Sequence, residues 1–355
     1  MQTKIRFASW LRATKCNSFP SAKKNLKRNM SIRVLKQGIL ASVQSLSRNG
    51  YRHLGIGSGG AMDAFAMQVA NFLVGNEEDA AVIEMHFPAP EILFLEDALI
   101  SLAGADFDAC AGEEPLPAWK PCFITKGSVL KCRKPVWGSK LYLAVRGGWE
   151  AEQWLGSRST HLKVAAAGFR GRTFQKEDVI GFANQPAVSG KQISGWNITV
   201  PDLPEIYPEE NRIRCIRGPE WSLLSEISKE AFGKETFAIS HQSDRMGYRL
   251  TGSPLNQDQP EEMVSSPVDA GTVQLLPDGN LIVLMADHQT TGGYPRVASV
   301  LQADMPALAQ LNPGNRFCFT IVEPRQAEEA LISSKQNLQA IKERCLRYYQ
   351  NHNPH

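Results

Sequence analysis

Several common sequence signatures are missing from this chain of 355 residues. Its seven cysteines form no Cys-x-x-Cys pair, which argues against a zinc site and against a disulfide framework. No apolar run approaches the roughly 20 residues of a membrane-spanning helix. There is also no Walker A motif, no His-Glu-x-x-His motif and no Ala-Met-Lys-Met sequence. We therefore expect a cytoplasmic protein with buried, reduced thiols, without a metal site and without a membrane partner. We also expect that the chain does not bind a nucleotide by itself and carries no covalently attached biotin.

Acidic residues are missing from the first part of the chain. Eight of the 39 basic residues and none of the 36 acidic residues lie in residues 1–29, so the rest of the chain has a net charge of −5. A mildly acidic body argues against a nucleic-acid partner. The basic stretch fits a disordered arm or an organelle-targeting peptide, but residues 30–35 also read as a natural start. We expect residues 1–29 to lie outside the fold, as a basic extension or a start assigned too early.

The remaining sequence predicts a mainly β fold with some α-helix. Short apolar segments bounded by Pro and Gly indicate strands, and the regular strand–helix alternation of doubly wound folds is missing. Strands are expected at 81–86, 91–95, 98–103, 128–132, 141–145, 212–217, 236–240, 272–276, 281–286 and 316–322. Helices are expected at 61–74, 221–230, 304–310 and 325–349; the last carries an apolar stripe that we expect to pack on the body of the protein.

Both halves of the sequence are rich in strands, and a less regular stretch separates them. Residues 182–208 are rich in Asn, Pro, Ser and Gly, which indicates a linker. The expected organisation is a first domain at 30–182, a linker at 183–208, a second domain at 209–324, and a C-terminal helix and tail at 325–355.

The segment that carries the most chemistry follows the apolar run 281–285, which reads as a buried strand. The loop after this run consists of Asp287, His288, Gln289, Thr290, Thr291, Gly292, Gly293 and Tyr294. Polar groups at the end of a strand can be held rigidly against a ligand, although a polar turn gives the same pattern. We expect Gln289 and Tyr294 to orient a substrate, and Asp287 or His288 to act as its acid or base.

A glycine-rich run at 55–60 lies directly ahead of the first expected helix. Such a run can wrap its N–H groups around an anion at a helix N-terminus. The polar, turn-like residues before it argue against a dinucleotide site, which needs a strong preceding strand. A candidate anion nest remains open, with the members Arg52, His53, Gly57, Ser58, Gly59, Gly60 and Asp63.

Two further segments combine arginine with hydroxyl or acidic groups. The first, made of Ser157, Arg158, Ser159 and Thr160, fits either a clamp for an oxyanion or phosphate or a capped turn. The second contains Asp244, Arg245, Tyr248 and Arg249. Its two arginines can present guanidinium groups to a carboxylate or phosphate, or they can pin a loop. We expect both segments to share one substrate pocket with residues 286–295, with Arg245 in a catalytic role.

Several segments in collinear order resemble one protein family. They are residues 32–38, 43–53, 60–63, 70–76, 156–160, 243–250 and 289–295. Together they are similar to the allophanate hydrolase subunit 2 family, whose members include the KipA proteins and the C subunit of 5-oxoprolinase. The resemblance covers about residues 31–322. His288 departs from the family pattern, which usually has an arginine there, so a permanent positive charge is not expected at this position.

The resemblance implies two cyclophilin-like β-barrel units in tandem. It also implies the C subunit of an ATP-dependent 5-oxoprolinase, inactive alone, that cleaves 5-oxoproline to glutamate with ATP and Mg in the complex. Its partners would be a subunit 1 homologue of the B type (KipI-like) and a lamB/YcsF-type protein as the A subunit. Other branches of the family leave two alternatives. One is the carboxyltransferase component of a biotin-dependent urea or amide carboxylase, and the other is a non-catalytic, KipA-type regulator of a histidine kinase.

Overall fold

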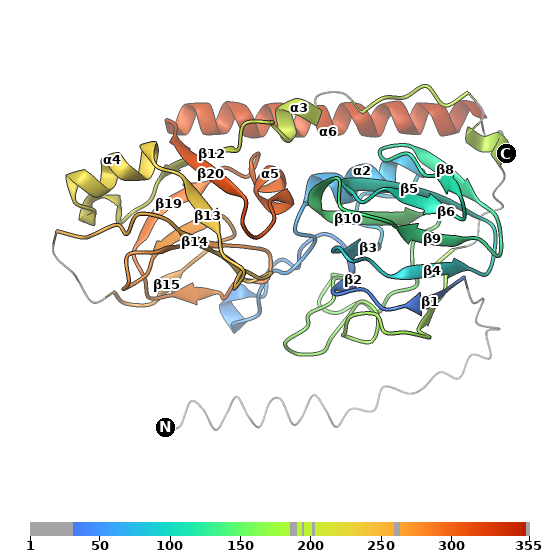
Figure 1. Cartoon of the computed structure of the whole chain (residues 1–355), viewed down its shortest axis with the longest axis horizontal. Helices are drawn as coiled ribbons and strands as arrows, with labels where there is room; N and C mark the ends of the chain where they lie inside the picture. The colour runs from blue at the N-terminus through green and yellow to red at the C-terminus, as the bar shows by residue number, and fades with distance from the viewer. Residues whose placement is uncertain (1–30, 185–189, 194, 201–202, 259–262, 353–355) are drawn as a thin grey trace.

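The computed structural model describes residues 31–184, 190–193, 195–200, 203–258 and 263–352. Residues 1–29, which we expect to form a basic extension, lie outside the described residues. The described strands fall into two β units that lie side by side beneath one long C-terminal helix (Figure 1). The predicted mainly β fold is therefore confirmed.

The first unit consists of two β-sheets around a common apolar core. One sheet has the order β11 (Val179–Ile180), β1 (Ile32–Lys36), β4 (Glu91–Phe94), β9 (Val129–Cys132), β6 (Ala109–Ala111), β7 (Glu114–Pro115). The other has the order β2 (Ala41–Gln44), β3 (Val82–Met85), β10 (Trp137–Val145), β5 (Ala98–Asp106), β8 (Pro121–Ile124). Buried and half-buried residues alternate along β4, so one of its faces packs inward. Trp149 is among the largest fully buried side chains of this core.

The second unit is a closed barrel. Its strands are, in order, β12 (Arg212–Arg217), β19 (Arg296–Val300), β16 (Thr272–Leu275), β17 (Leu281–Leu284), β14 (Gly247–Thr251), β13 (Phe237–Ile239), β20 (Arg316–Ile321). Parallel pairing of β12 with β20 closes the barrel, which removes its free edges. The interior is packed with aromatic rings, including Phe232 and Phe319, which stack with centroids 4.6 Å apart. A small sheet of β15 (Ser266–Pro267) and β18 (Thr291–Gly292) is separate from the barrel strands.

The helices lie close to their predicted positions. α2 (Ala64–Leu73) and α5 (Met305–Gln310) occupy the segments expected at 61–74 and 304–310. The segment expected at 221–230 divides into the short 3-10 helix η3 (Trp221–Leu223) and α4 (Glu226–Lys234). The division follows from Ser225, whose hydroxyl accepts the backbone N–H of Ser228 and caps a new helix. Three short helices, η1 (Arg52–Leu54), η2 (Gly190–Ile193) and α3 (Leu203–Ile206), complete the described elements.

The connection between the two units packs on the first of them. An apolar row from this connection lies against Phe65, Val69 and Leu73 of α2; its members are Trp196, Ile198, Val200, Leu203, Ile206 and Tyr207. Residues 185–189, 194 and 201–202 of the expected linker lie outside the described residues. The domain boundaries themselves stay a prediction, but the described part of the connection is a packed element of the structure.

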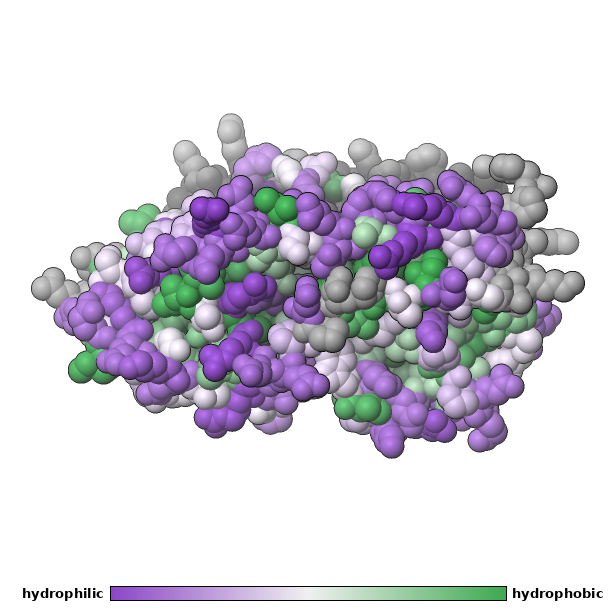
Figure 2. All heavy atoms as spheres, turned by 90° about the horizontal axis from the view of Figure 1, so that it is seen from above, coloured by the Kyte–Doolittle hydropathy of each residue, from purple (hydrophilic) through white to green (hydrophobic). Residues whose placement is uncertain are grey.

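The long helix α6 (Pro324–His352) runs along both units (Figure 1). Its buried residues, Ile341, Cys345, Tyr348 and Tyr349, gather near its C-terminal end, where the helix packs on α2. The Tyr349 hydroxyl donates a hydrogen bond to the Leu73 carbonyl over 2.7 Å. The expected docking of this helix on the body is therefore confirmed. Figure 2 shows that hydrophilic residues cover most of the face that α6 occupies.

The described cysteines are free thiols, and Cys16 lies outside the described residues. Burial raises the pKa values of Cys132, Cys215 and Cys345 to about 12, so these thiols stay protonated and unreactive near neutral pH. None of the helices among the described residues is long and apolar enough to cross a membrane.

Candidate active site between the two units

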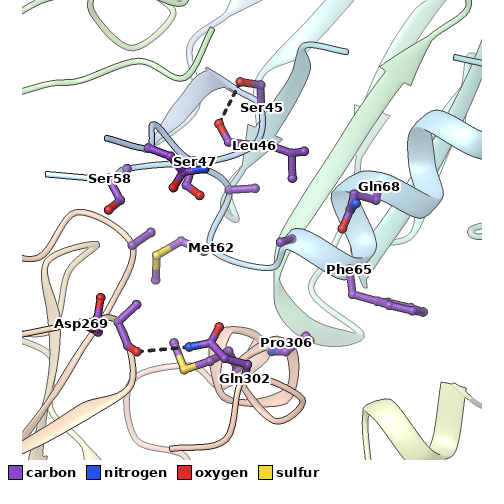
Figure 3. A pocket seen from close by; sticks show the side chains of 18 of the residues that line it. Ser45, Leu46, Ser47, Ser58, Met62, Phe65, Gln68, Asp269, Gln302 and Pro306 are labelled. Carbon is purple, nitrogen blue, oxygen red and sulfur yellow. Dashed lines mark hydrogen bonds between the residues drawn. The ribbon is translucent and has the colours of Figure 1, made fainter. Parts of the chain in front are cut away.

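A cavity of about 450 Å³ lies between the two units, in the contact that we call the seam. The first unit supplies the turn after β2, the glycine-rich run and the start of α2, and the barrel supplies residues 269–270, 286, 288, 302 and 305–306. Figure 3 shows Ser47 and Ser58 of the first unit on one side, with Asp269 and Gln302 of the barrel on the other. One edge of this seam cavity belongs to α6. Its volume suits a small polar molecule.

Seven of the residues that line the seam cavity carry hydroxyl or carboxamide groups. They are Ser45, Ser47, Asn49, Ser58, Gln68, Gln302 and Ser334. The side chains of Ser47, Ser58 and Gln68 make no hydrogen bond to another described residue. Such groups are free to donate to or accept from a ligand.

The glycine-rich run packs closely against the loop that follows β17. A Cβ atom on Gly57 would lie 3.1 Å from the His288 carbonyl oxygen, and one on Gly59 would lie 3.7 Å from Asp287 Oδ1. Gly60 has a φ of +104°, a conformation that favours glycine. The Cβ on Gly59 would also lie 3.4 Å from an Arg48 guanidinium nitrogen, so the run faces one charge of each sign. This packing argues against the predicted anion nest, because the glycines serve the close approach of the two units.

The other members of the predicted nest have structural partners. Arg52 pairs with Asp269 across the seam, and His53 is exposed outside the cavity lining. Asp63 caps α2 by accepting the N–H of Ala66 over 2.9 Å. Its other oxygen accepts hydrogen bonds from Tyr207 at 2.7 Å and from Gln310 at 2.8 Å. Burial raises the pKa of Asp63 to about 6. Asp63 therefore joins α2, the connection and the barrel.

Arg245 lies inside the seam and is 5% exposed. Its guanidinium pairs with Glu84 of the first unit and with Asp287 of the barrel, where Nε donates over 2.8 Å. It also donates to the Gly60 carbonyl over 2.6 Å. Burial opposes the ionisation of Glu84, but the positive charge of Arg245 outweighs this effect and holds the pKa of Glu84 well below its usual range. Four of the five N–H donors of Arg245 bind Glu84, Asp287 and the Gly60 carbonyl, so the structure favours a joint between the units over the expected catalytic role.

Lys140 and Tyr248 extend this network on the barrel side. Lys140 is 4% exposed, and its ammonium donates to Ser139 over 2.6 Å and to the Tyr248 hydroxyl over 3.2 Å. The Tyr248 hydroxyl in turn donates to the Ala309 carbonyl over 3.2 Å. Burial lowers the pKa of Lys140 to about 8. The position of Tyr248 in the barrel core argues against the substrate contact expected from the sequence.

His288 is the member of the predicted catalytic set that lines the seam cavity. It is 3% exposed, and its Nδ1 donates to the Gln289 carbonyl over 2.5 Å. Burial lowers the pKa of His288, so the ring is neutral at neutral pH. Because Nδ1 carries the proton, Nε2 is left as an acceptor. The structure thus offers a positioned neutral base at the position where the family pattern usually has an arginine.

Residues 157–160 join the end of β2 to the rest of the first unit. Ser157 donates to the Leu46 carbonyl over 2.8 Å, and Thr160 donates to the Val43 carbonyl over 2.8 Å. Ser159 accepts the N–H of Ser45 over 2.9 Å and donates to its carbonyl over 3.1 Å. Arg158 instead faces the surface, 3.7 Å from Asp79. Of the two interpretations that the sequence leaves open, these contacts favour the capped turn over the clamp for an oxyanion or phosphate.

The remaining predicted residues do not meet at the seam cavity. Asp244 and Arg249 are exposed, and Asp244 closes a turn by accepting the N–H of Met246 over 2.8 Å. Gly293 and Tyr294 line a separate hollow, with residues 255–257 and 275–279. Gln289, Thr290, Thr291 and Gly292 are not among the residues that line the seam cavity. The predicted wall at 286–295 therefore reaches the cavity only through Ala286 and His288.

Comparison with known proteins assigns the chain to a family. Residues 54–321 match the family described as "Carboxyltransferase domain, subdomain A and B". The chain belongs to this family. The matched region contains the glycine-rich run, α2 and the loop after β17, whereas α6 follows it. The matched region thus supplies most of the residues that line the seam cavity, and the rest come from residues 45–52 before it and from α6 after it.

Two relatives are named as the C subunit of 5-oxoprolinase. The one from Haemophilus influenzae is 34% identical over 287 residues, which cover 81% of this chain and 90% of the relative. The one from Escherichia coli is 33% identical over 303 residues, which cover 84% of this chain and 94% of the relative. Among solved structures, the K. lactis urea amidolyase superposes with a TM-score of 0.79 at 24% identity, over 88% of this chain and 20% of that chain. This last likeness shows a shared fold.

The residues of the seam cavity are of two kinds. Gln68, Gln302 and Lys335 carry no motif, come from three distant parts of the sequence and meet only in the folded chain. Others lie in segments that the sequence singles out, among them Arg52, Ser58, Gly59 and Gly60 of the predicted anion nest and His288 of the loop after β17. In the described parts of the chain, no group of three or more His, Cys, Asp or Glu side chains could hold a metal ion.

Proposed function

We propose that this chain is the C subunit of an ATP-dependent 5-oxoprolinase and that the seam cavity binds 5-oxoproline. The observation that carries the proposal is the match to two proteins named as the C subunit of 5-oxoprolinase, over at least nine-tenths of their length. A cavity of about 450 Å³ with free hydroxyl and carboxamide groups is consistent with a small lactam. The overall reaction consumes one ATP and two water molecules: one water adds across the lactam C–N bond to give glutamate, and the other hydrolyses ATP to ADP and phosphate.

In this proposal the cavity orients the lactam through neutral groups. Ser47, Ser58 and Gln68 can donate to the lactam oxygen, and donors fixed before the reaction stabilise the charge that develops there. Nε2 of His288 can accept a proton from the water that attacks the carbonyl carbon. Asp287, the other candidate acid or base, is held by Arg245 in the seam network. His288 is therefore the candidate base.

Nucleotide binding belongs to the complex in this proposal. The glycine-rich run of this chain packs against the loop that contains Asp287, and the sequence has no Walker A motif, so we do not assign the phosphate groups of ATP to this run. We place ATP and Mg with the two partners, a KipI-like protein as the B subunit, and a lamB/YcsF-type protein as the A subunit. We place the complex in the cytoplasm. The chain alone is then expected to be inactive.

The test is reconstitution of the chain with these two partners, followed by an assay of ATP hydrolysis that depends on 5-oxoproline. Activity is expected only when all three subunits are present. Replacement of His288 by Gln should lower kcat about a hundredfold, because general-base catalysis contributes at least that factor. Replacement of the exposed His53 by Gln is the matched control and should have no effect. An active wild-type complex with an unaffected His288→Gln variant would overturn the assignment of the base.

The acid side of the pH profile gives a second test of His288. The base must be neutral, and burial lowers its pKa below the ordinary value of 6.5. The neutral form therefore predominates at pH 6.5 and above, and kcat/KM should fall only at lower pH as the ring gains a proton. An acid limb centred above pH 6.5 would contradict the geometry described for His288.

A carboxyltransferase function is the second candidate. It is favoured by the family match over residues 54–321 and by the fold shared with the K. lactis urea amidolyase. The chain would then accept carboxylate from biotin carried by a partner, because the sequence has no Ala-Met-Lys-Met acceptor site. Transfer of carboxylate from biotin to urea by a reconstituted complex, without activity toward 5-oxoproline, would favour this candidate.

A further inference from the structure

Lys335 of α6 lines the seam cavity, yet α6 lies outside the region matched to the carboxyltransferase family. The family segment and this helix therefore make separate contributions to one cavity. The helix is anchored near its C-terminal end, where Tyr348 and Tyr349 pack on α2, and Lys342 pairs with Glu78 over 3.2 Å. Lys335 stands two turns before Lys342, at the edge of the cavity.

The charges around the cavity distinguish Lys335 from the other lining residues. The other fully charged lining residues, Arg52 and Asp269, pair with one another. His288 is neutral at neutral pH, since burial lowers its pKa. Lys335 makes no salt bridge with another described residue. The residues three and four positions away along α6 are Leu331, Ile332, Leu338 and Gln339, none of which carries a charge.

We propose that Lys335 is a specificity-determining residue that binds the carboxylate of an anionic lactam in the seam cavity. An ammonium group on a helix edge can pair with a carboxylate at the cavity mouth while the neutral groups inside hold the ring. The inference rests on the proposed 5-oxoprolinase function. It goes further by assigning discrimination between lactam acids and neutral amides, such as urea, to a helix outside the family segment.

The variants are Lys335→Met, Lys335→Arg and Arg344→Met. Lys335→Met removes the charge but keeps much of the stem, whereas Lys335→Arg keeps the charge. Arg344→Met removes an exposed positive charge from the same helix, away from the cavity lining, and is the matched control. The ligands are 5-oxoproline and 2-pyrrolidone, the same ring without the carboxylate.

The measurements are KM and kcat for 5-oxoproline and the inhibition constant of 2-pyrrolidone, in the reconstituted complex of all three subunits. Lys335→Met should raise KM about tenfold, as expected for loss of one charge-assisted contact, with kcat within twofold. The inhibition constant of 2-pyrrolidone should not change. Lys335→Arg and Arg344→Met should keep a wild-type KM. A KM for 5-oxoproline that is unaffected by Lys335→Met in an active complex would overturn the inference.

Direct binding to the full chain separates this inference from the proposed function. Saturation-transfer NMR of the wild type should detect 5-oxoproline more strongly than 2-pyrrolidone, and Lys335→Met should abolish the difference. If the complex hydrolyses no ATP with 5-oxoproline but the chain still prefers the anionic ligand through Lys335, the reaction is wrong and the specificity assignment stands. If the complex is inactive and the chain shows no preference that depends on Lys335, both are overturned.

Discussion

Two neighbouring parts of the seam use polar residues in opposite ways. In the buried network, the charge of Arg245 is paired with Glu84 and Asp287, and its guanidinium also donates to the Gly60 carbonyl. In the adjoining cavity, Ser47 and Ser58 make no side-chain hydrogen bond to another described residue. Buried charges need partners to persist, whereas a binding site needs polar groups with unused capacity. The difference shows that the most conspicuous charged residues join the units, and that the less conspicuous hydroxyls surround the site.

The largest effect is expected from breaking the network at Arg245. Arg245→Met leaves the Glu84 carboxylate buried without its partner, and breaking such a pair costs about 3–5 kcal/mol of unfolding free energy. Urea unfolding followed by fluorescence measures the loss. Arg249→Met, at an exposed position four residues later on β14, is the control and should change stability by less than about 0.5 kcal/mol.

A second variant keeps this test decisive if Arg245→Met fails to fold. Adding Glu84→Gln removes the unpaired charge, so the double variant should recover part of the lost stability. Full stability of Arg245→Met together with loss of substrate binding would reverse the conclusion. Arg245 would then serve the substrate, as the sequence suggests.

The next effect concerns the pH dependence of the same network. Lys140 has a pKa of about 8 in the folded protein, against 10.5 for an unperturbed lysine. Between these values the unfolded chain binds a proton that the folded chain does not, so this contribution to stability rises with pH. Relative to Lys140→Met, the wild type should gain up to about 3 kcal/mol between pH 8 and 10.5. Titration of the facing Glu84, Asp63 and Arg245 largely cancels in this difference.

Urea unfolding of both proteins at pH 7.5 and pH 10 measures this gain. Lys140→Arg, which keeps its charge throughout the range, is the control and should show no such rise relative to Lys140→Met. A constant difference between wild type and Lys140→Met would mean that Lys140 stays charged in the folded protein.

The sequence predicts the fold better than the site for a physical reason. Apolar periodicity reports burial within a single strand or helix, so 281–286 and 304–310 are predicted close to β17 and α5. Strand β14 escapes this reasoning because Gly247, Tyr248 and Arg249 read as a loop of functional groups. Its buried positions hold a glycine and a tyrosine as well as a leucine, so the strand shows no clear apolar alternation in the sequence.

The residues of the site are hard to predict from the sequence, because the hydrogen-bond and ion-pair partners of a side chain are set only in the folded chain. Arg245 and Ser159 look like ligand-binding residues in sequence, but their partners Glu84 and Ser45 lie more than 110 residues away. His288 can be found from the sequence because it stands in a loop directly after a strand. Lys335 cannot, since an exposed lysine on a polar helix is ordinary until the helix is placed over a cavity.

A smaller effect on stability is expected in the segment 157–160. Ser159→Ala removes the hydroxyl that accepts the N–H of Ser45 and donates to its carbonyl, in a fully buried setting. An unsatisfied buried donor costs about 1–3 kcal/mol. Urea unfolding should register this loss, and kcat of the reconstituted complex should stay within about threefold of wild type. A large loss of kcat without a loss of stability would instead favour the oxyanion clamp, the other interpretation that the sequence leaves open.

Arg158→Ala should have the smallest effect, and it separates the two interpretations of this segment most cleanly. Its guanidinium is at the surface, and its ion pair with Asp79, at 3.7 Å between half-exposed groups, contributes less than about 1 kcal/mol. A capped turn does not need this side chain, so stability and KM should both stay near wild type. An oxyanion clamp would need its charge above all. Arg158→Ala therefore distinguishes a surface charge without a role in binding from one that contacts the substrate. A tenfold rise in KM would show that Arg158 contacts the substrate.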